Sequence, residues 1–129
     1  MAGTVVIDTL QSSTTSPVAF TNTNGTAIGT LCRAWVNFNP TSGSAVIAAS
    51  FNVSSVTYNA TGAWTVNFTN SMPDANYAVA STSKQAGSGG SIMVIDQTVA
   101  PTASACKLNL YNTVSGNLNV TIVTASFFR

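Results

Sequence analysis

The sequence has almost no charged side chains and lacks two residue types altogether. It contains no histidine and no glutamate, and charged residues make up 5% of the 129 residues, where a typical soluble domain has about 25%. Acid–base catalysis, nucleophilic triads and imidazole metal sites need such side chains within reach of one another. The few carboxylates are scattered Asp residues, so the sequence predicts that the protein is not an enzyme and uses no cofactor or metal. The charged residues are Asp8, Arg33, Asp74, Lys84, Asp96, Lys107 and Arg129.

The shortage of charge also limits the possible partners. The net charge is +1 with four basic residues, and nucleic-acid binding needs many more contacts to phosphate than these can supply. The sequence has no apolar run of about 18 residues, which a membrane helix needs, and Met1–Ile7 lacks the basic start of a secretion signal. We therefore expect no nucleic acid, no membrane insertion, and synthesis in a cytoplasm.

Hydroxyl and amide side chains take the place of the missing charges. Thr, Ser and Asn number 19, 16 and 13 of the 129 residues. A small domain usually keeps a net charge of a few units, which holds its copies apart in solution. A neutral surface therefore favours a subunit of an assembly, although a polar, uncharged monomer stays open as an alternative.

The two cysteines, Cys32 and Cys106, have several possible roles. Without an export signal, both are expected to be reduced thiols. Both lie on apolar strand faces, so a disulfide between two sheets is also geometrically possible. No His or cationic cluster lies nearby in the sequence to lower a thiol pKa, which favours buried structural thiols over a reactive site.

Alternation of apolar and polar residues with a period of two runs from Leu31 to the C-terminus and predicts β-strands. Gly, Pro and Asn separate these strands at short intervals, which is typical of an antiparallel β-sandwich. We therefore predict an all-β, jelly-roll-like sandwich over residues 31–129. The predicted strands are residues 31–38, 46–58, 63–69, 76–83, 91–96, 104–111 and 117–128.

Three predicted strands have a clear inward face. The inward side chains are Cys32, Ala34, Val36 and Phe38 in the first strand, Trp64, Val66 and Phe68 in the third, and Cys106, Leu108 and Leu110 in the sixth.

Other segments allow more specific predictions. The apolar positions of 46–58 change register partway, which predicts a bulge or break near Ser54 and Ser55. The segment 91–96 is almost entirely apolar and is expected to be buried on both sides. A turn at Ser115-Gly116 predicts that the last two strands form a hairpin.

Residues 1–30 differ from the rest of the chain. A short apolar run, Val5-Val6-Ile7, precedes a low-complexity stretch of Ser, Thr, Asn and Gly. This composition predicts an extended N-terminal arm instead of a folded layer. The arm either wraps around its own domain or docks on another chain.

Aromatic residues at two places suggest a contact between subunits. Trp35 and Arg33 share the outward face of the first predicted strand, and both residue types are enriched at interface centres. Trp35 could instead be core, if its strand lies between two sheets. Near the C-terminus, Phe127 and Phe128 point to opposite sides of a regular strand, so one of them is expected to pack on a neighbouring subunit.

Four stretches together resemble a module of tailed-bacteriophage virion proteins of the tail-fibre or head-fibre type. They are Arg33–Phe38, Ser50–Val56, Thr65–Phe68 and Met72–Tyr77, and the resemblance covers about residues 33 to 80. It implies a β-sandwich that forms a homotrimer and projects from a virion, and it brings no catalytic residues. The long shaft and large adaptor domain of a long tail fibre are missing.

The resulting hypothesis is a virion structural protein, assembled in the bacterial host cytoplasm, that serves as a short fibre or a capsid decoration protein. Val5, Val6 and Ile7 would attach it to other capsid or tail proteins by adding a strand to a sheet edge. The alternative is a fibre tip that binds a host cell-surface glycan or receptor. Candidate contacts for that role are Tyr58, Asp74, Asn76 and Tyr77.

Overall fold

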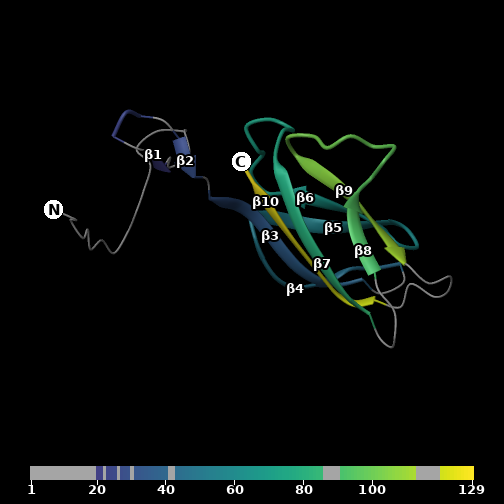
Figure 1. Ribbon diagram of the computed structural model, residues 1–129. Helices are drawn as coiled ribbons and strands as arrows, with labels where there is room; N and C mark the ends of the chain where they lie inside the picture. Colours follow the sequence, from purple (N-terminus) through teal and green to yellow (C-terminus); the bar gives the residue numbers. More distant parts are fainter. Residues whose placement is uncertain are drawn as a thin grey trace. The chain divides into compact units, whose positions relative to one another are not determined.

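The computed structural model (Figure 1) describes residues 20–21, 23–25, 27–29, 31–40, 43–85, 91–112 and 120–129. The chain divides into two units, residues 1–31 and 32–129. The first unit contains a short antiparallel pair, β1 (Phe20–Thr21) with β2 (Ala27–Gly29), in a stretch where the sequence suggested no strand. The run Val5–Ile7 lies outside the described residues.

The second unit is a β-sandwich, as predicted. Two four-stranded antiparallel sheets face each other (Figure 1). Sheet I has the strand order β4-β3-β10-β7, and sheet II has the order β5-β6-β9-β8. The strands are β3 (Cys32–Asn39), β4 (Val46–Phe51), β5 (Val53–Ala60), β6 (Ala63–Phe68), β7 (Ala78–Gln85), β8 (Ser91–Ile95), β9 (Ala105–Asn112) and β10 (Val120–Phe128).

The core lies between the two sheets and follows from the alternation in the sequence. Successive side chains of a strand point to opposite faces, so the apolar set of each strand meets that of the facing sheet. The three predicted inward faces are confirmed, except that Cys32 is only half-buried. Fully buried core residues include Ala34, Val36, Phe38, Val66, Cys106, Leu108 and Phe127.

Asn52 forms the corner at which the chain passes from sheet I to sheet II. Its φ of 54° lies in the left-handed region, which Asn tolerates better than most residues. The side chain donates to the Arg33 and Asn70 carbonyls at 3.1 and 3.0 Å, and its Oδ1 accepts from the Asn70 amide at 2.8 Å. The predicted bulge near Ser54 and Ser55 is confirmed, because the register of β5 against β6 shifts between Val53 and Ser55; Asn52 adds the corner just before it.

Replacing Asn52 is expected to destabilise the sandwich. Asn52→Ala removes three hydrogen bonds and puts alanine, which tolerates the left-handed region less well than asparagine, at this φ angle, for a loss of about 2–3 kcal/mol. Asn52→Gly also loses the bonds but tolerates the φ angle, and should lose about 1 kcal/mol less. Urea unfolding of both variants measures the difference; equal losses would show that the backbone angle contributes nothing.

The predicted hairpin between the last two strands is wrong. Strand β9 pairs with β6 and β8 in sheet II, whereas β10 pairs with β3 and β7 in sheet I. The register of β10 also shifts between Val120 and Ile122, so that Val120 and Val123 are buried and Ile122 is 38% exposed. An extra residue at such a bulge reverses the faces, which the local alternation did not reveal.

Strand β8 is not buried on both sides, as its apolar sequence had suggested. It is an edge strand of sheet II, with Met93 buried and Ile92 54% exposed. A short apolar run does not by itself distinguish a central strand from an edge strand. The β7 and β8 edges are joined across the sandwich, because Ser81 Oγ donates to the Met93 carbonyl at 3.1 Å and Ser83 Oγ lies 2.6 Å from Ser91 Oγ.

Candidate subunit-contact face

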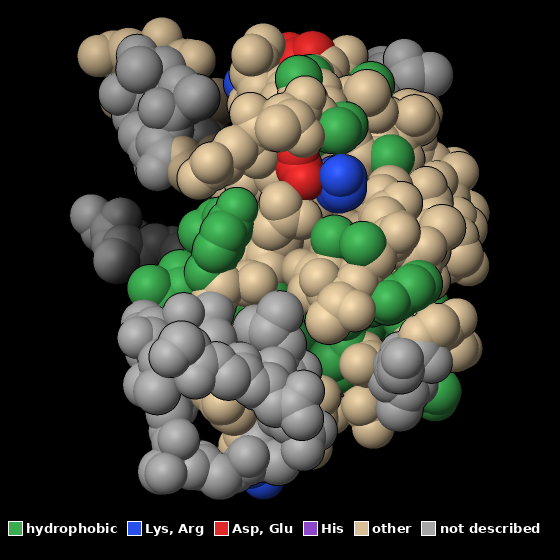
Figure 2. Space-filling model, turned by 90° about the vertical axis from the view of Figure 1, so that its right-hand side faces the viewer, with side chains coloured by type: hydrophobic (Ala, Val, Ile, Leu, Met, Phe, Trp, Pro, Cys, Tyr) green, Lys and Arg blue, Asp and Glu red, His purple; other side chains and the backbone are tan. Residues whose placement is uncertain are grey.

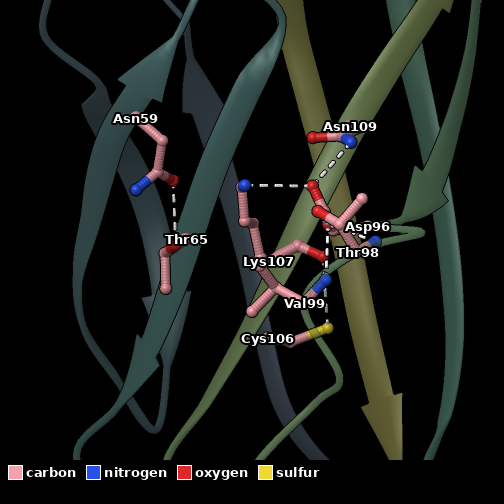
Figure 3. A network of polar contacts seen from close by, with 8 residues as sticks. All are labelled: Asn59, Thr65, Asp96, Thr98, Val99, Cys106, Lys107 and Asn109. Atoms are coloured by element: carbon pink, nitrogen blue, oxygen red, sulfur yellow. Dashed lines mark hydrogen bonds and ion pairs between the residues drawn. The ribbon is translucent and has the colours of Figure 1, made fainter.

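The outer face of sheet II is polar over β5 and β6, where short side chains bond one another, and it carries an exposed apolar pair, Ile92 and Tyr111, over β8 and β9. Thr65 Oγ1 donates to Asn59 Oδ1 at 2.8 Å (Figure 3). Asn67 Nδ2 donates to Ser55 Oγ at 3.0 Å and to Thr57 Oγ1 at 2.9 Å. Such a ladder of short hydroxyl and amide side chains across β5 and β6 suits contact with water.

A buried carboxylate holds the loop after β8 (Figure 3). Asp96 Oδ1 accepts from the Thr98 amide and hydroxyl at 2.8 and 2.7 Å and from the Val99 amide at 2.7 Å. Its Oδ2 lies 3.1 Å from Lys107 Nζ and 2.7 Å from Asn109 Nδ2. The hydrogen bonds from Thr98 outweigh burial and hold the pKa of Asp96 below its usual range. With both oxygens engaged, this carboxylate has a structural role.

Within the described residues, no three His, Cys, Asp or Glu side chains lie together as a metal site, and no helix there is long and apolar enough to cross a bilayer. Cys32 and Cys106 are free thiols. Burial raises the pKa of Cys106 to about 11. This thiol is therefore protonated at neutral pH and packs as a core side chain.

The outer face of sheet I has an apolar region at the end where Trp35 lies, next to a polar row of Asn37, Thr124 and Thr82. Phe51, Trp35, Ser126 and Ala80 lie in one cross-strand row over β4, β3, β10 and β7. Trp35 is 38% exposed and its direct partner Phe51 is 57% exposed. We call this surface the apolar face; it consists of Trp35, Ala49, Phe51, Ala78, Ala80 and Phe128.

The apolar face has little charge around it. Among the described residues, the outward positions of sheet I include two charged side chains, Arg33 beside the Phe128 end and Lys84 opposite Ile122 at the other end. Charged side chains are few also on another side of the molecule, the β8 and β9 side drawn in Figure 2. Exposed aromatic side chains on a neutral sheet face are typical of a surface that another protein covers.

Three of the four predicted interface residues meet at this face. Arg33 and Trp35 point outward, because Ala34 between them is buried. Phe128 is half-buried on the same side of the sheet. Of Phe127 and Phe128, one of which was expected to face a neighbouring subunit, Phe127 is not that residue, because its ring is fully buried in its own core, with its centroid 5.0 Å from that of Phe68.

The predicted glycan-contact residues do not form one surface. Tyr77 is buried, and its hydroxyl lies 3.1 Å from the carbonyl oxygens of both Thr102 and Ala105, to which its single proton can be donated, so it is not available to a ligand. Tyr58 is half-buried and pairs with Trp64, near the turn between β5 and β6. Asp74 lies in the loop before β7 and binds Arg129, and Asn76 is exposed in the same loop.

The sequence did not identify Phe51 as part of the site. Ile47, Ala49 and Phe51 occupy alternate positions, so the sequence pattern places all three on one face of the strand. A register shift between β3 and β4 leaves Ile47 opposite Phe38 but places Phe51 opposite Trp35, on the outside. No residue type in this stretch marks the register shift, so the outward position of Phe51 could be determined only from the structure.

Comparisons of the chain with family models, with curated proteins and with solved structures gave no match.

Proposed function

We propose that the protein is a structural subunit of a bacteriophage virion, a homotrimeric short fibre or capsid decoration protein. The observation that carries this proposal is the cross-strand pair of Trp35 and Phe51, exposed on a nearly uncharged sheet face. The resemblance of residues 33–80 to fibre-type modules supports the virion assignment. Four of the seven connections between consecutive strands from β3 to β10 cross between the sheets, which favours a jelly-roll-like description.

In this proposal the two outer faces have different roles. The apolar face packs against other copies around a symmetry axis, where covering Trp35, Phe51 and Phe128 supplies the free energy of assembly. The polar ladder on β5 and β6 of sheet II remains in contact with water. Adhesion thus depends on surface burial and needs no titrating or nucleophilic group.

The N-terminal arm is proposed to attach the trimer to the particle through Val5, Val6 and Ile7. Deleting residues 1–12 is expected to abolish incorporation into virions while leaving the sandwich folded and trimeric, because the buried core of the described residues is built from Ala34 to Phe127. Quantifying the truncated protein in purified particles, with sedimentation of the free protein, measures both effects.

A matched control replaces Val5, Val6 and Ile7 by serine without shortening the chain. This variant distinguishes the loss of apolar strand pairing from the loss of chain length. We expect it to be excluded from particles to the same extent as the truncated protein. Particles that retain the truncated protein at the wild-type level would contradict the attachment role.

A further inference from the structure

The connection between β1 and β2 (Figure 1) contains an asparagine that is followed by glycine, Asn24-Gly25. Every other asparagine of the chain precedes a residue that carries a β-carbon. An asparagine side chain can react with the backbone nitrogen of the residue that follows it. Glycine favours this reaction, because no β-carbon shields its nitrogen and its backbone reaches conformations that other residues avoid.

The reaction is a substitution at the side-chain amide of Asn24. The Gly25 nitrogen, once deprotonated, attacks Asn24 Cγ, so that a new C–N bond forms, the Cγ–Nδ2 bond breaks and ammonia leaves with the proton. The product is a five-membered succinimide ring, which water opens at either of its two carbonyls. One opening gives aspartate, and the other gives isoaspartate, in which the main chain runs through the former side chain. Solvent water is the sole co-reactant.

The structure leaves this site open to solvent. Asn24 and Gly25 are both exposed. Gly25 has a φ of 76°, and no heavy atom beyond its chain neighbours lies within 4 Å of the point where a β-carbon would stand. Ring closure requires the Asn24 side chain and the following peptide to rotate toward each other. An exposed connection between short strands resists that rotation less than a strand within a sheet does.

Other asparagines lie where hydrogen bonds hold the backbone. After Asn67 in β6, the Phe68 amide donates to the Ser104 carbonyl at 2.9 Å, so the attacking nitrogen is already engaged. Asn70 is exposed, but its amide donates to Asn52 Oδ1 at 2.8 Å and its carbonyl accepts from Asn52 Nδ2 at 3.0 Å. These bonds fix the peptides that would have to rotate, and we expect both sites to react more slowly.

We propose that Asn24 is a site of spontaneous deamidation, with aspartate and isoaspartate as its products. Either product carries a carboxylate that is ionised at neutral pH, so one added negative charge takes the formal net charge of the chain from +1 to zero. Proteins without net charge associate more readily, so modified copies should be less soluble than new ones. The modification does not depend on the proposed virion role or on the proposed trimer.

Mass spectrometry of the full-length protein, incubated at mildly alkaline pH, tests the proposal. Exchange of the amide for a carboxylate raises the mass by about 1 Da, and the tryptic fragment that ends at Arg33 should carry this gain. That fragment should separate into two products of equal mass, because aspartate and isoaspartate are isomers. The rate should rise with pH, since the deprotonated nitrogen is the nucleophile.

Two glutamine variants give the matched comparison. Asn24→Gln keeps an amide but would have to close a larger, six-membered ring, which forms far more slowly. Asn70→Gln makes the same change at another exposed asparagine. We expect the mass gain to be lost in Asn24→Gln and kept in Asn70→Gln. A gain that persists in Asn24→Gln, or one that disappears in Asn70→Gln, would overturn the proposal.

Incubation in urea tests whether the fold leaves the site reactive. Unfolding frees every asparagine, so Asn67 and Asn70 should gain mass faster in urea than in the folded protein. Asn24 should react in the folded protein as well. If Asn24 reacts in urea and stays unmodified in the folded protein, the β1–β2 connection protects it and the proposal is wrong.

Discussion

Replacing Trp35 and Phe51 together by serine is expected to convert the assembly into folded, separate chains. Both rings are exposed on sheet I, so their loss leaves the core of the sandwich intact. Large aromatic side chains at the centre of an interface contribute about 2 kcal/mol or more each. The double substitution should therefore raise the dissociation constant about a thousand-fold. Sedimentation over a range of concentrations measures this change.

A second exposed apolar pair provides the matched control. Ile92 and Tyr111 are cross-strand partners on sheet II, 54% and 46% exposed, and their exposed apolar side chains resemble those of the first pair. Serine at both positions should leave the assembly unchanged. If the Ile92 and Tyr111 variant dissociates and the Trp35 and Phe51 variant does not, the contact lies on sheet II and the assignment of the apolar face is wrong.

Asp96→Asn is expected to lower stability far more than Asp74→Asn does. Each carboxylate binds a cation, but the Asp96 side chain is 3% exposed and that of Asp74 is 38% exposed. An amide at position 96 would direct a donor toward the Lys107 ammonium or Asn109 amide and leave a buried cation unpaired. Thermal unfolding of both variants at neutral pH gives the comparison; equal midpoints would show that the buried network contributes no more than the exposed pair.

The same carboxylate makes the stability depend on pH. The pKa of Asp96 is lower in the folded chain than its ordinary value of 3.8, so folding favours the ionised form. Its contribution is complete above that ordinary value and is lost progressively as the pH falls below it. Asp96→Asn should therefore flatten the decline of the unfolding midpoint at acidic pH, measured against the wild type in the same buffers.

Much of the sandwich could be predicted because its strands alternate strictly. A strand has a single possible inward face when its large apolar residues occupy alternate positions. Two examples are the sets Trp64, Val66 and Phe68, and Cys106, Leu108 and Leu110. The prediction failed where one extra residue shifts the register, as at Ile122, because a bulge reverses the faces without altering the composition. Which sheet a strand joins also depends on contacts far along the chain, and the expected hairpin failed for that reason.

The candidate site was predictable in part for similar reasons. Trp35 and Arg33 were identified because an unburied aromatic stands out on a strand whose other face is core. The partners of the charged residues could not be read from the sequence, since Arg129 binds Asp74 across 55 positions. Among the described residues, the ion pairs are Lys107 with Asp96 and Arg129 with Asp74, and the two cations on sheet I, Arg33 and Lys84, are in neither pair.

The serine hydroxyls that join β7 to β8 tie together the edge strands on one flank of the sandwich. The two flanks are therefore unequally protected against pairing with strands of other chains. On the opposite flank, β4 is the edge strand of sheet I. Its sequence, Val-Ile-Ala-Ala-Ser-Phe, has neither a charge nor a proline. Natural edge strands use charge and proline to resist unwanted pairing. If the protein aggregates at high concentration, we expect aggregation to begin with pairing of the Val46–Phe51 strands of different chains.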